Sequence, residues 1–537
     1  VPLIAIIVFK GVMSQTDPLT DRPDNPYGTL SACTTGTDIF TSDNSKIWIY
    51  LQQQEVLKEI GSVGAEGAAY TGIIIIAVLV VTVIIGLVYL IRRKKGAAYY
   101  HTEVEKIWFF IAFTVLLAGM GVPFVWKMDW LLDYLSAFRQ FRSLGRFALI
   151  YYNIATISGV VLLYHWTKKI SAKNKVAGLA ILLLAGGIWA WEAKGFADRR
   201  RDRSMVGTYN YNYFTSKYEG SWNEFLEDNG YDSTDFQAIM TIPFVSVGSE
   251  KIWLFRGDWG GFCIATRASY QLKLPMISSI MSRSSWSRTF KQIKNASGPF
   301  GDRPTIDDMK SDKDFLLLDY EDYEKNPDES FYLPLADSIG HFHQYTVYRL
   351  SFDKLTKALA SARQRGLEVA DSLTGRDTSL AGMDHYYGHF DDLYKGVHFA
   401  GTGAQKQIQA RDSVIFKKGV ADWDKTQEYE VSIWALVNDF DYKGPLLELR
   451  CYNEANTEIG YFEFYANGSV YDTEDFWFRI SRYFKMPEET KDITITTKYS
   501  GPDVYYAFDE LLIRAAADTI VSKDGQGNIL VNNHLLK

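Results

Sequence analysis

Residues 69–91 read AYTGIIIIAVLVVTVIIGLVYLI, a stretch without one charged residue, and basic residues 92–95 follow it directly. As a helix this stretch spans the ~30 Å hydrocarbon core of a bilayer, where only intra-helical hydrogen bonds satisfy the backbone. Basic residues favour the cytoplasmic end of such a helix, so we expect it to run from outside to inside. The sequence therefore predicts an integral membrane protein.

Further apolar stretches predict a bundle of about five spanning helices within residues 1–195, of which the first is partial. They lie at 1–13, 107–126, 147–164 and 176–191. Lysines after residues 91 and 164 agree on one topology, in which residues 14–68 form an outer loop. The arginines from residue 199 onward disagree with it, but the rule is weak before a long translocated region. Because residues 1–13 look like the second half of a helix, we expect the chain to be the C-terminal portion of a longer protein.

Between the third and fourth apolar stretches, residues 129–146 have the pattern of an amphipathic helix on the outer membrane surface. Arg139, Arg142 and Arg146 form one stripe of it, separate from the apolar stripe. Three guanidinium groups at this surface could hold a phosphate or diphosphate head group. The alternative is a plain interfacial anchor whose arginines contact membrane lipid.

The remaining sequence is soluble in composition. Residues 205–370 mix strand-like and helix-like segments and predict an extracytoplasmic α/β domain. Short alternating strands at 380–517 predict a β-sandwich, and residues 518–537 look like a tail. The net charge of −7 argues against a nucleic-acid partner, whereas 15% aromatic residues suit membrane interfaces and sugar-stacking surfaces.

Acidic residues near the predicted membrane face are weak catalytic candidates. Asp17, Asp21 and Asp24 in the outer loop, and Glu66 before the first complete helix, could supply a base or help to bind a divalent metal. The alternative for the three aspartates is capping of backbone amides in turns, which their composition favours. The histidines at 385, 389 and 398 lack a convincing zinc-site context, since Gly388 and the onset of the strands argue against a helix.

Several motifs resemble the GT-C-type, YfhO-like multipass membrane glycosyltransferase-like proteins of Bacteroidota. They are TDPLTDRPDNPYG at 16–28, Glu66-Gly67 with Ala69-Tyr70, FRSLGRF at 141–147, FQAIMTIPFVSVGSEKIW at 236–253 and LPMISSIMSRSSWSRT at 274–289. The resemblance implies a multipass protein of the bacterial inner membrane with a periplasmic C-terminal region. It implies transfer of a sugar from a polyprenyl-phosphate carrier to an extracytoplasmic glycan or protein, with the acidic catalytic motif upstream of Val1.

The C-terminal strands, with YEVSIWALV, LLELRCYN and FDELLIR, resemble jelly-roll carbohydrate-binding modules. This resemblance implies glycan binding, for which Trp423, Trp434 and Trp477 are candidates, although each could equally be core. It also implies a structural calcium ion, with Asp509 as a weak candidate ligand. Two functions stay open: a part of a membrane glycosyltransferase, or a non-catalytic, membrane-anchored glycan-binding or cell-envelope assembly protein.

Overall fold

The computed structural model forms two compact units, which are described separately: Asp24–Asn210, and Val1–Pro23 together with Tyr211–Lys537. We call them the helical unit and the C-terminal unit. The description excludes residues 1–7, 9–10, 13–14, 17–18, 20, 24–28, 31, 59, 61–65, 93–102, 140, 142, 206–220, 249–250, 256–258, 282–283, 322–324, 374–376, 380–383, 408–411, 438–444, 466–467, 499–505 and 537. Most of the predicted partial helix at 1–13 therefore lies outside the described residues.

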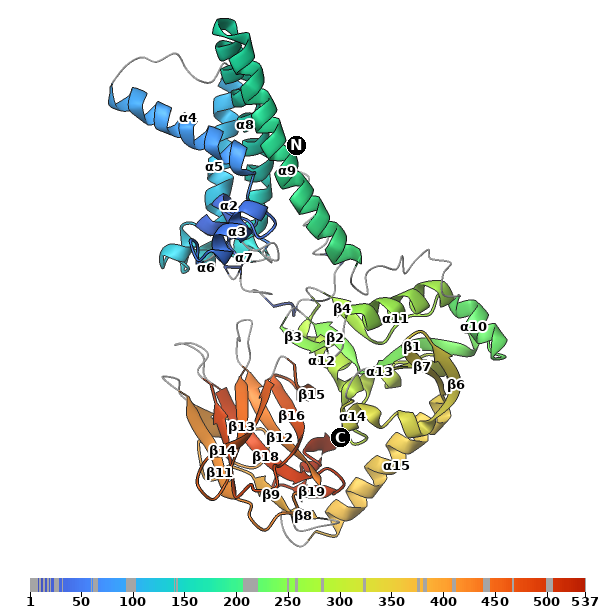
Figure 1. The fold of residues 1–537 in the computed structure, drawn as a ribbon. Helices are drawn as coiled ribbons and strands as arrows, with labels where there is room; N and C mark the ends of the chain where they lie inside the picture. Colours follow the sequence, from blue (N-terminus) through green and yellow to red (C-terminus); the bar gives the residue numbers. More distant parts are fainter. Residues whose placement is uncertain are drawn as a thin grey trace. The chain divides into compact units, whose positions relative to one another are not determined.

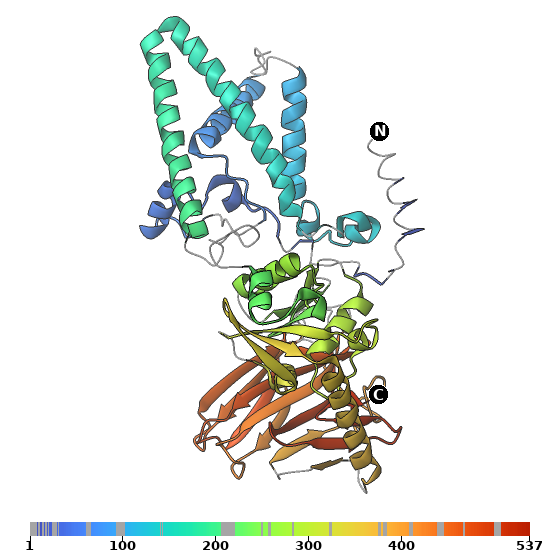
Figure 2. The ribbon, with the colours of Figure 1, turned by 90° about the vertical axis from the view of Figure 1, so that its right-hand side faces the viewer.

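Four long helices build the described part of the helical unit (Figure 1). Helix α8 contacts the other three, and Asn174 ends it and caps the next helix through its side chain, which accepts a hydrogen bond from the amide of Ala177 (3.1 Å). Figure 2 shows α8 and α9 as a helical hairpin joined at this point. The four helices are α4 (Ile73–Ile91), α5 (Glu103–Gly119), α8 (Ala148–Lys173) and α9 (Lys175–Met205).

Within the described residues, two helices are long and apolar enough to cross a membrane, at Leu144–Lys173 and Lys175–Arg199. The apolar parts of α4 and α5, Ile73–Val88 and Ile107–Gly119, are shorter. The structure thus shows two candidate spans where the hydropathy of the sequence predicts about five.

Short helical segments lie at one end of this unit, two of them before α4 and four between α5 and α8. They are α2 (Gly36–Phe40), α3 (Lys46–Gln53), η1 (Phe124–Trp126), α6 (Leu131–Tyr134), α7 (Ser136–Arg139) and η2 (Leu144–Phe147). The prediction of one continuous amphipathic helix over 129–146 is wrong. Leu135 leaves helical geometry (φ −108°, ψ 47°) and Ser143 is extended (φ −154°, ψ 121°), so the apolar periodicity is divided among three separate turns.

In the C-terminal unit, residues 221–371 form a mixed α/β region. Its larger sheet has the order β1-β5-β7-β6, in which β1 and β5 are parallel and the other pairs antiparallel. A smaller sheet has the order β3-β2-β4. The strands are β1 (Phe236–Ile242), β2 (Val245–Gly248), β3 (Ile252–Phe255), β4 (Ser279–Met281), β5 (Asp314–Tyr320), β6 (Ala336–Phe342) and β7 (Tyr345–Leu350). The helices include α10 (Trp222–Asp228), α11 (Trp259–Leu272), α12 (Trp286–Ile293), α13 (Pro304–Asp307), α14 (Pro327–Ser330) and α15 (Phe352–Asp371).

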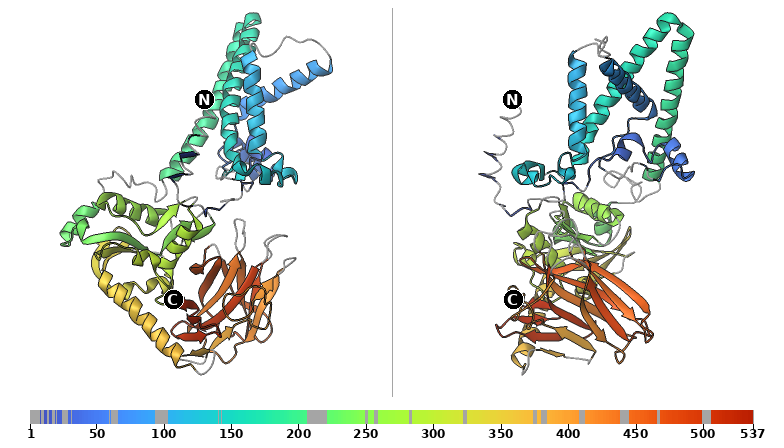
Figure 3. Two further views of the ribbon diagram at one scale, coloured as in Figure 1. Left: turned by 180° about the vertical axis from the view of Figure 1, so that it is seen from behind. Right: turned by 90° about the vertical axis from the view of Figure 1, so that its left-hand side faces the viewer.

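Two antiparallel sheets form the β-sandwich that follows, which confirms the prediction for this region (Figure 3). One sheet has the order β10-β18-β12-β16-β15, with β9 also paired to β18, and the other has the order β11-β17-β13-β14. Their strands are β9 (His385–Gly388), β10 (Gln405–Gln407), β11 (Ser413–Gly419), β12 (Glu428–Val437), β13 (Leu446–Tyr452), β14 (Glu458–Tyr465), β15 (Val470–Glu474), β16 (Trp477–Lys485), β17 (Asp492–Thr497) and β18 (Tyr506–Ala515).

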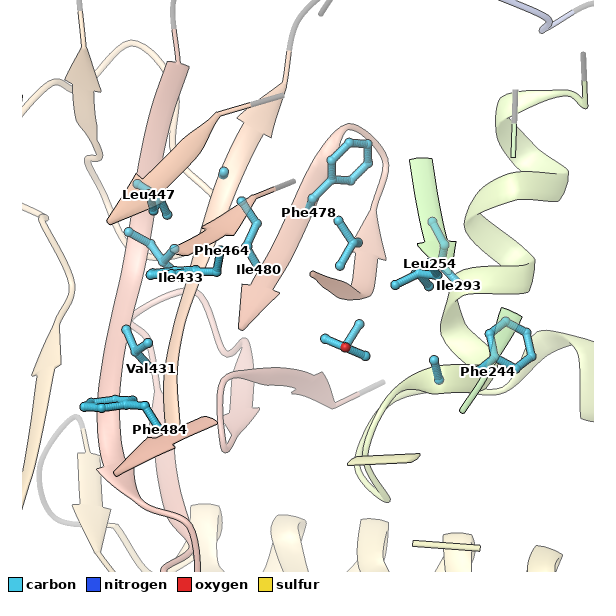
Figure 4. Packing of buried hydrophobic residues seen from close by; sticks show 14 of the residues in the cluster. Phe244, Leu254, Ile293, Val431, Ile433, Leu447, Phe464, Phe478, Ile480 and Phe484 are labelled. Carbon is cyan, nitrogen blue, oxygen red and sulfur yellow. The ribbon is translucent and has the colours of Figure 1, made fainter. Parts of the chain in front are cut away.

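One hydrophobic core runs through the α/β region and the sandwich (Figure 4). Phe244, Leu254 and Ile293 belong to the same buried cluster as Ile433 and Phe478. The rings of Phe290 and Phe478 are 5.6 Å apart between centroids. The two predicted domains are therefore parts of one packed body.

The described part of 518–537 forms strands rather than a tail. They form β19 (Ile520–Lys523), β20 (Ile529–Val531) and β21 (His534–Leu536), which continue a sheet with β8 (Asp377–Ser379) in the order β21-β20-β19-β8.

Candidate functional site

Close backbone contacts hold together the loops at one end of the helical unit. The amide of Thr34 donates to the carbonyl of Gly119 (2.8 Å), and the amide of Gly145 donates to that of Ala32 (3.0 Å). The hydroxyl of Thr34 donates to the carbonyl of Gly67 (2.9 Å). A Cβ on Gly145 would lie 2.5 Å from the oxygen of Ala32 and 2.7 Å from the Cα of Gly67, so glycine is required for this approach. Glu66-Gly67 and FRSLGRF at 141–147, two motifs that are far apart in the sequence, thus meet at this end of the unit.

The same end brings together two of the predicted site residues. The guanidinium of Arg146 pairs with the carboxylate of Glu66 at 2.7 Å, across 80 positions of sequence, and its side chain remains 59% exposed. Arg139 pairs with Asp133 instead. Arg142 lies outside the described residues. Arg139 and Arg146 of the predicted stripe therefore bind two different carboxylates. The partner of Arg146 is Glu66, one of the weak catalytic candidates.

A cavity of about 470 Å³ opens at this end of the helical unit. The loops contribute mainly polar residues, whereas α8 and α9 contribute apolar and aromatic residues together with the carboxylate of Glu192. The lining residues are Ser42, Asn44, Ser45, Ala68, Tyr70, Thr71, Gly72, Leu149, Tyr152, Trp189, Glu192, Ala193 and Phe196. A cavity with these two kinds of lining suits an amphipathic ligand.

Glu192 of α9 is the buried charged group of this cavity. Its Oε1 accepts hydrogen bonds from the hydroxyls of Tyr70 (2.6 Å) and Ser45 (2.9 Å), and its Oε2 accepts one from the amide of Ile73 (3.0 Å). All three donors are neutral, and no ion pair joins Glu192 to a cation among the described residues. The carboxylate thus holds the first turn of α4 and the loop before α3 against α9.

Sequence reasoning missed Glu192, although a signal was present. The residue interrupts the apolar run GLAILLLAGGIWAW at 178–191 with an acidic group. An ionisable residue in such a helix is costly and marks a functional site by default. Its partners could not be found in this way, because they lie 119 to 147 positions away.

Asp21 has a capping role. Its carboxylate accepts from the amide of Ser287 (2.7 Å), and its carbonyl accepts from the amide of Trp286 (2.9 Å), at the start of α12. Burial raises the pKa of Asp21, but the hydrogen bonds from Ser287 outweigh it and hold that pKa below its usual range. Asp21 therefore has the amide-capping role that the sequence offers as the alternative to a catalytic base. Asp17 and Asp24 lie outside the described residues.

The three candidate tryptophans of the sandwich are buried. Trp434 has no exposed surface, and the ring of Phe399 lies on its indole, whose N–H donates to the carbonyl of Asn533 (2.9 Å). Trp423 stacks on Tyr429, with ring centroids 5.4 Å apart, and Trp477 packs in the cluster of Trp434. All three tryptophans therefore pack against other parts of the chain, as expected if they belong to the core and not to a glycan-binding surface.

Asp509 binds backbone amides. Its Oδ2 accepts from Phe399 (2.8 Å) and Ala400 (3.1 Å), and its Oδ1 accepts from Glu510 (2.9 Å). Burial and the nearby charge of Glu510 raise its pKa to about 8. Within the described part of the chain, no group of three or more His, Cys, Asp and Glu side chains could hold a metal ion. The residues around Asp509 therefore do not fit the calcium ion that the resemblance implies, nor does the described outer loop gather ligands for a divalent metal.

A buried charge network lies on the sheet face that carries Trp434. Arg479 pairs with Glu430 and, at 3.2 Å, with Asp328 of α14, while Arg514 pairs with Glu430 at 2.6 Å. His534 of the last strand adds a contact at 3.0 Å to Asp472. These charges join the sandwich, the α/β region and the last strands.

No protein-family model and no curated protein matches this chain. Similar solved structures include the CBM22-1 xylan-binding domain from Paenibacillus barcinonensis Xyn10C (14% identity, TM-score 0.18), of which the match covers 86%, and 26% of this chain. The enzymatically active domain of Bacteriophage CBA120 tailspike protein 4 (10% identity, TM-score 0.18) is matched over 26% of this chain but only 19% of its own. Family 16 Carbohydrate Binding Module-2 (12% identity, TM-score 0.18) is matched over 22% of this chain and 82% of its own.

Proposed function

We propose that this chain is the C-terminal part of a membrane glycosyltransferase-like protein whose helical unit binds a sugar linked to polyprenyl phosphate. The observation that carries the proposal is the cavity with both apolar and polar lining; its lining residues Ala68 and Leu149 follow Glu66 and Arg146, which pair with each other, by two and three positions. A lipid-linked sugar has an apolar chain, a phosphate and hydroxyl groups. The apolar lining, Arg146 and the polar lining match these three parts.

Arg146 is the proposed contact for the phosphate. A guanidinium has five N–H donors, and its pairing with Glu66 leaves most of the side chain exposed. Planar, charge-assisted hydrogen bonds from arginine are well suited to phosphate oxygens. Arg139 and Arg142 remain further candidates from the sequence, and the acceptor would be an extracytoplasmic glycan or protein at the bacterial inner membrane.

Binding of bare polyprenyl phosphate to the full chain in lipid nanodiscs tests this proposal. We expect Arg146→Ala to weaken binding at least about tenfold, the loss of one charge-assisted contact. Lys194→Ala is the control, because this lysine is 71% exposed on α9 and, among the described residues, pairs with Asp198 in a surface contact. Equal affinity of the two variants, or no binding by the unmodified chain, would remove the proposal. In the longer protein that the resemblance implies, we expect Arg142→Ala to abolish sugar transfer and leave membrane insertion intact.

Glycan binding without catalysis, as in a cell-envelope assembly protein, is the second candidate function. Two tyrosines favour it: Tyr461 and Tyr465 point to the same face of β14, and each is 42% exposed. Tyrosine rings at such a surface can stack on sugars. A glycan array with the full chain tests this function. Binding that persists in the Tyr461→Ala, Tyr465→Ala double variant would exclude this face.

A further inference from the structure

We infer that Glu192 selects the sugar of the lipid-linked ligand, and that this sugar is uncharged and bears free hydroxyl groups. The inference rests on the proposed function and deepens it, because it gives a role to the buried carboxylate of the cavity. Arg146 would contact the phosphate, whereas Glu192 would contact the sugar.

The hydrogen bonds of Glu192 leave room for a ligand. A carboxylate offers about four acceptor positions, and the hydroxyls of Ser45 and Tyr70 and the amide of Ile73 occupy three of them. Among the described residues no other donor bonds to Glu192, so one position remains on Oε2. The donors already present include two hydroxyl groups, so the site has the chemistry that a sugar hydroxyl requires.

The charge of Glu192 is not compensated by a cation in the described structure. Burying a carboxylate among neutral donors is costly, and a further hydrogen bond from a ligand would reduce that cost. A hydroxyl can donate such a bond. A sugar carboxylate, as in a hexuronic acid, would instead bring a second negative charge into the same cavity, so we expect acidic sugars to be rejected.

Helix α9 presents Glu192 together with an aromatic surface. Trp189, Glu192, Ala193 and Phe196 all line the cavity, and their spacing of three, four and seven places them on one face of the helix. Trp189 is 60% exposed. An exposed indole one turn from a carboxylate can receive the C–H face of a pyranose while the carboxylate accepts from its hydroxyl edge.

The experiment compares three ligands on the full chain in lipid nanodiscs: bare polyprenyl phosphate, the same carrier with an uncharged hexose, and the same carrier with a hexuronic acid. We expect the hexose to raise affinity over the bare carrier at least about tenfold and the hexuronic acid not to raise it. In Glu192→Gln, the gain from the hexose should fall to less than about threefold and the difference between the two sugars should disappear.

Asp198→Asn is the matched control, because it makes the same chemical change on α9 at a residue that does not line the cavity. Tyr70→Phe is a second variant: it frees an acceptor position on Oε1 but keeps the charge, so rejection of the hexuronic acid should persist. If the unmodified chain binds both sugar-bearing carriers equally, or if Glu192→Gln behaves like Asp198→Asn, the inference is overturned while binding of the bare carrier still stands. If the bare carrier does not bind, the proposed function itself fails.

Discussion

The phenyl ring of Phe399 lies nearly parallel to the indole of Trp434, with ring centroids 3.8 Å apart and an interplanar angle of 13°. Phe399 belongs to a segment before β10 whose backbone is held by Asp509, while the neighbouring amide of Gly401 donates to Asp524 (2.9 Å). The outer face of the larger sandwich sheet is therefore occupied by the chain itself at Trp434, one of the three tryptophans that the sequence offers as candidates for either glycan stacking or core packing.

Phe399→Ala should destabilise the C-terminal unit by about 3 kcal/mol, because truncating a packed phenylalanine removes its buried surface and leaves a cavity. Thermal unfolding of the full chain measures this loss. Leu393→Ala, at a residue that is 44% exposed before the same segment, is the control and should change little. If Phe399→Ala gained glycan binding with unchanged stability, the segment would be a removable cover and not part of the core.

Arg479→Ala should cost about 3–5 kcal/mol, because it leaves the carboxylates of Glu430 and Asp328 buried without their partner. Arg450→Ala provides the comparison. Arg450 also bridges two carboxylates, Glu448 and Glu458, but it lies on the more exposed face of the other sheet, and its loss should cost less than about 1 kcal/mol. Equal unfolding temperatures for the two variants would contradict the role given to the buried network.

The raised pKa of Asp509 predicts that its contribution to stability falls as pH rises. The unfolded carboxyl loses its proton near the ordinary aspartate pKa of 3.8, whereas the folded one keeps it up to about 8. Between these values the folded state holds the additional proton, so unfolding becomes easier with increasing pH.

Asp509→Asn removes this titration and keeps a carbonyl to accept from the amides of Phe399 and Ala400. Its unfolding temperature relative to the unmodified chain should therefore rise between about pH 5 and about pH 9. A difference that does not depend on pH would show that Asp509 is ionised throughout this range in the folded state.

Gly145→Ala should disrupt the loop end of the helical unit, because the added Cβ would meet backbone atoms of Ala32 and Gly67 that cannot rotate away. Such overpacking costs about 1–3 kcal/mol. Gly86→Ala in α4 is the control: nothing lies within 4 Å of the added atom, and alanine stabilises a helix interior by roughly 0.5–1 kcal/mol. Protease protection of the helical unit distinguishes the two variants, and equal protection would argue against the close contact.

Much of the architecture follows from local sequence patterns. Apolar stretches locate the long helices, because hydropathy over about twenty residues is a property of one segment. Alternation of apolar and polar residues locates the strands of the sandwich, since successive side chains on a strand point to opposite faces of the sheet. Residues 129–146 show the limit: their helical periodicity is real, but the backbone breaks at Leu135 and Ser143 and forms separate turns.

The sequence by itself therefore determined the two-part organisation of this protein, an apolar helical part followed by a strand-rich part. Only the tertiary structure decided what individual side chains do. It placed Glu192 among Ser45, Tyr70 and Ile73, paired Arg146 with Glu66, and covered Trp434 with Phe399. The physical reason is that periodicity depends on neighbouring residues, whereas burial, charge pairing and cavities depend on residues that are distant in the chain and meet only on folding.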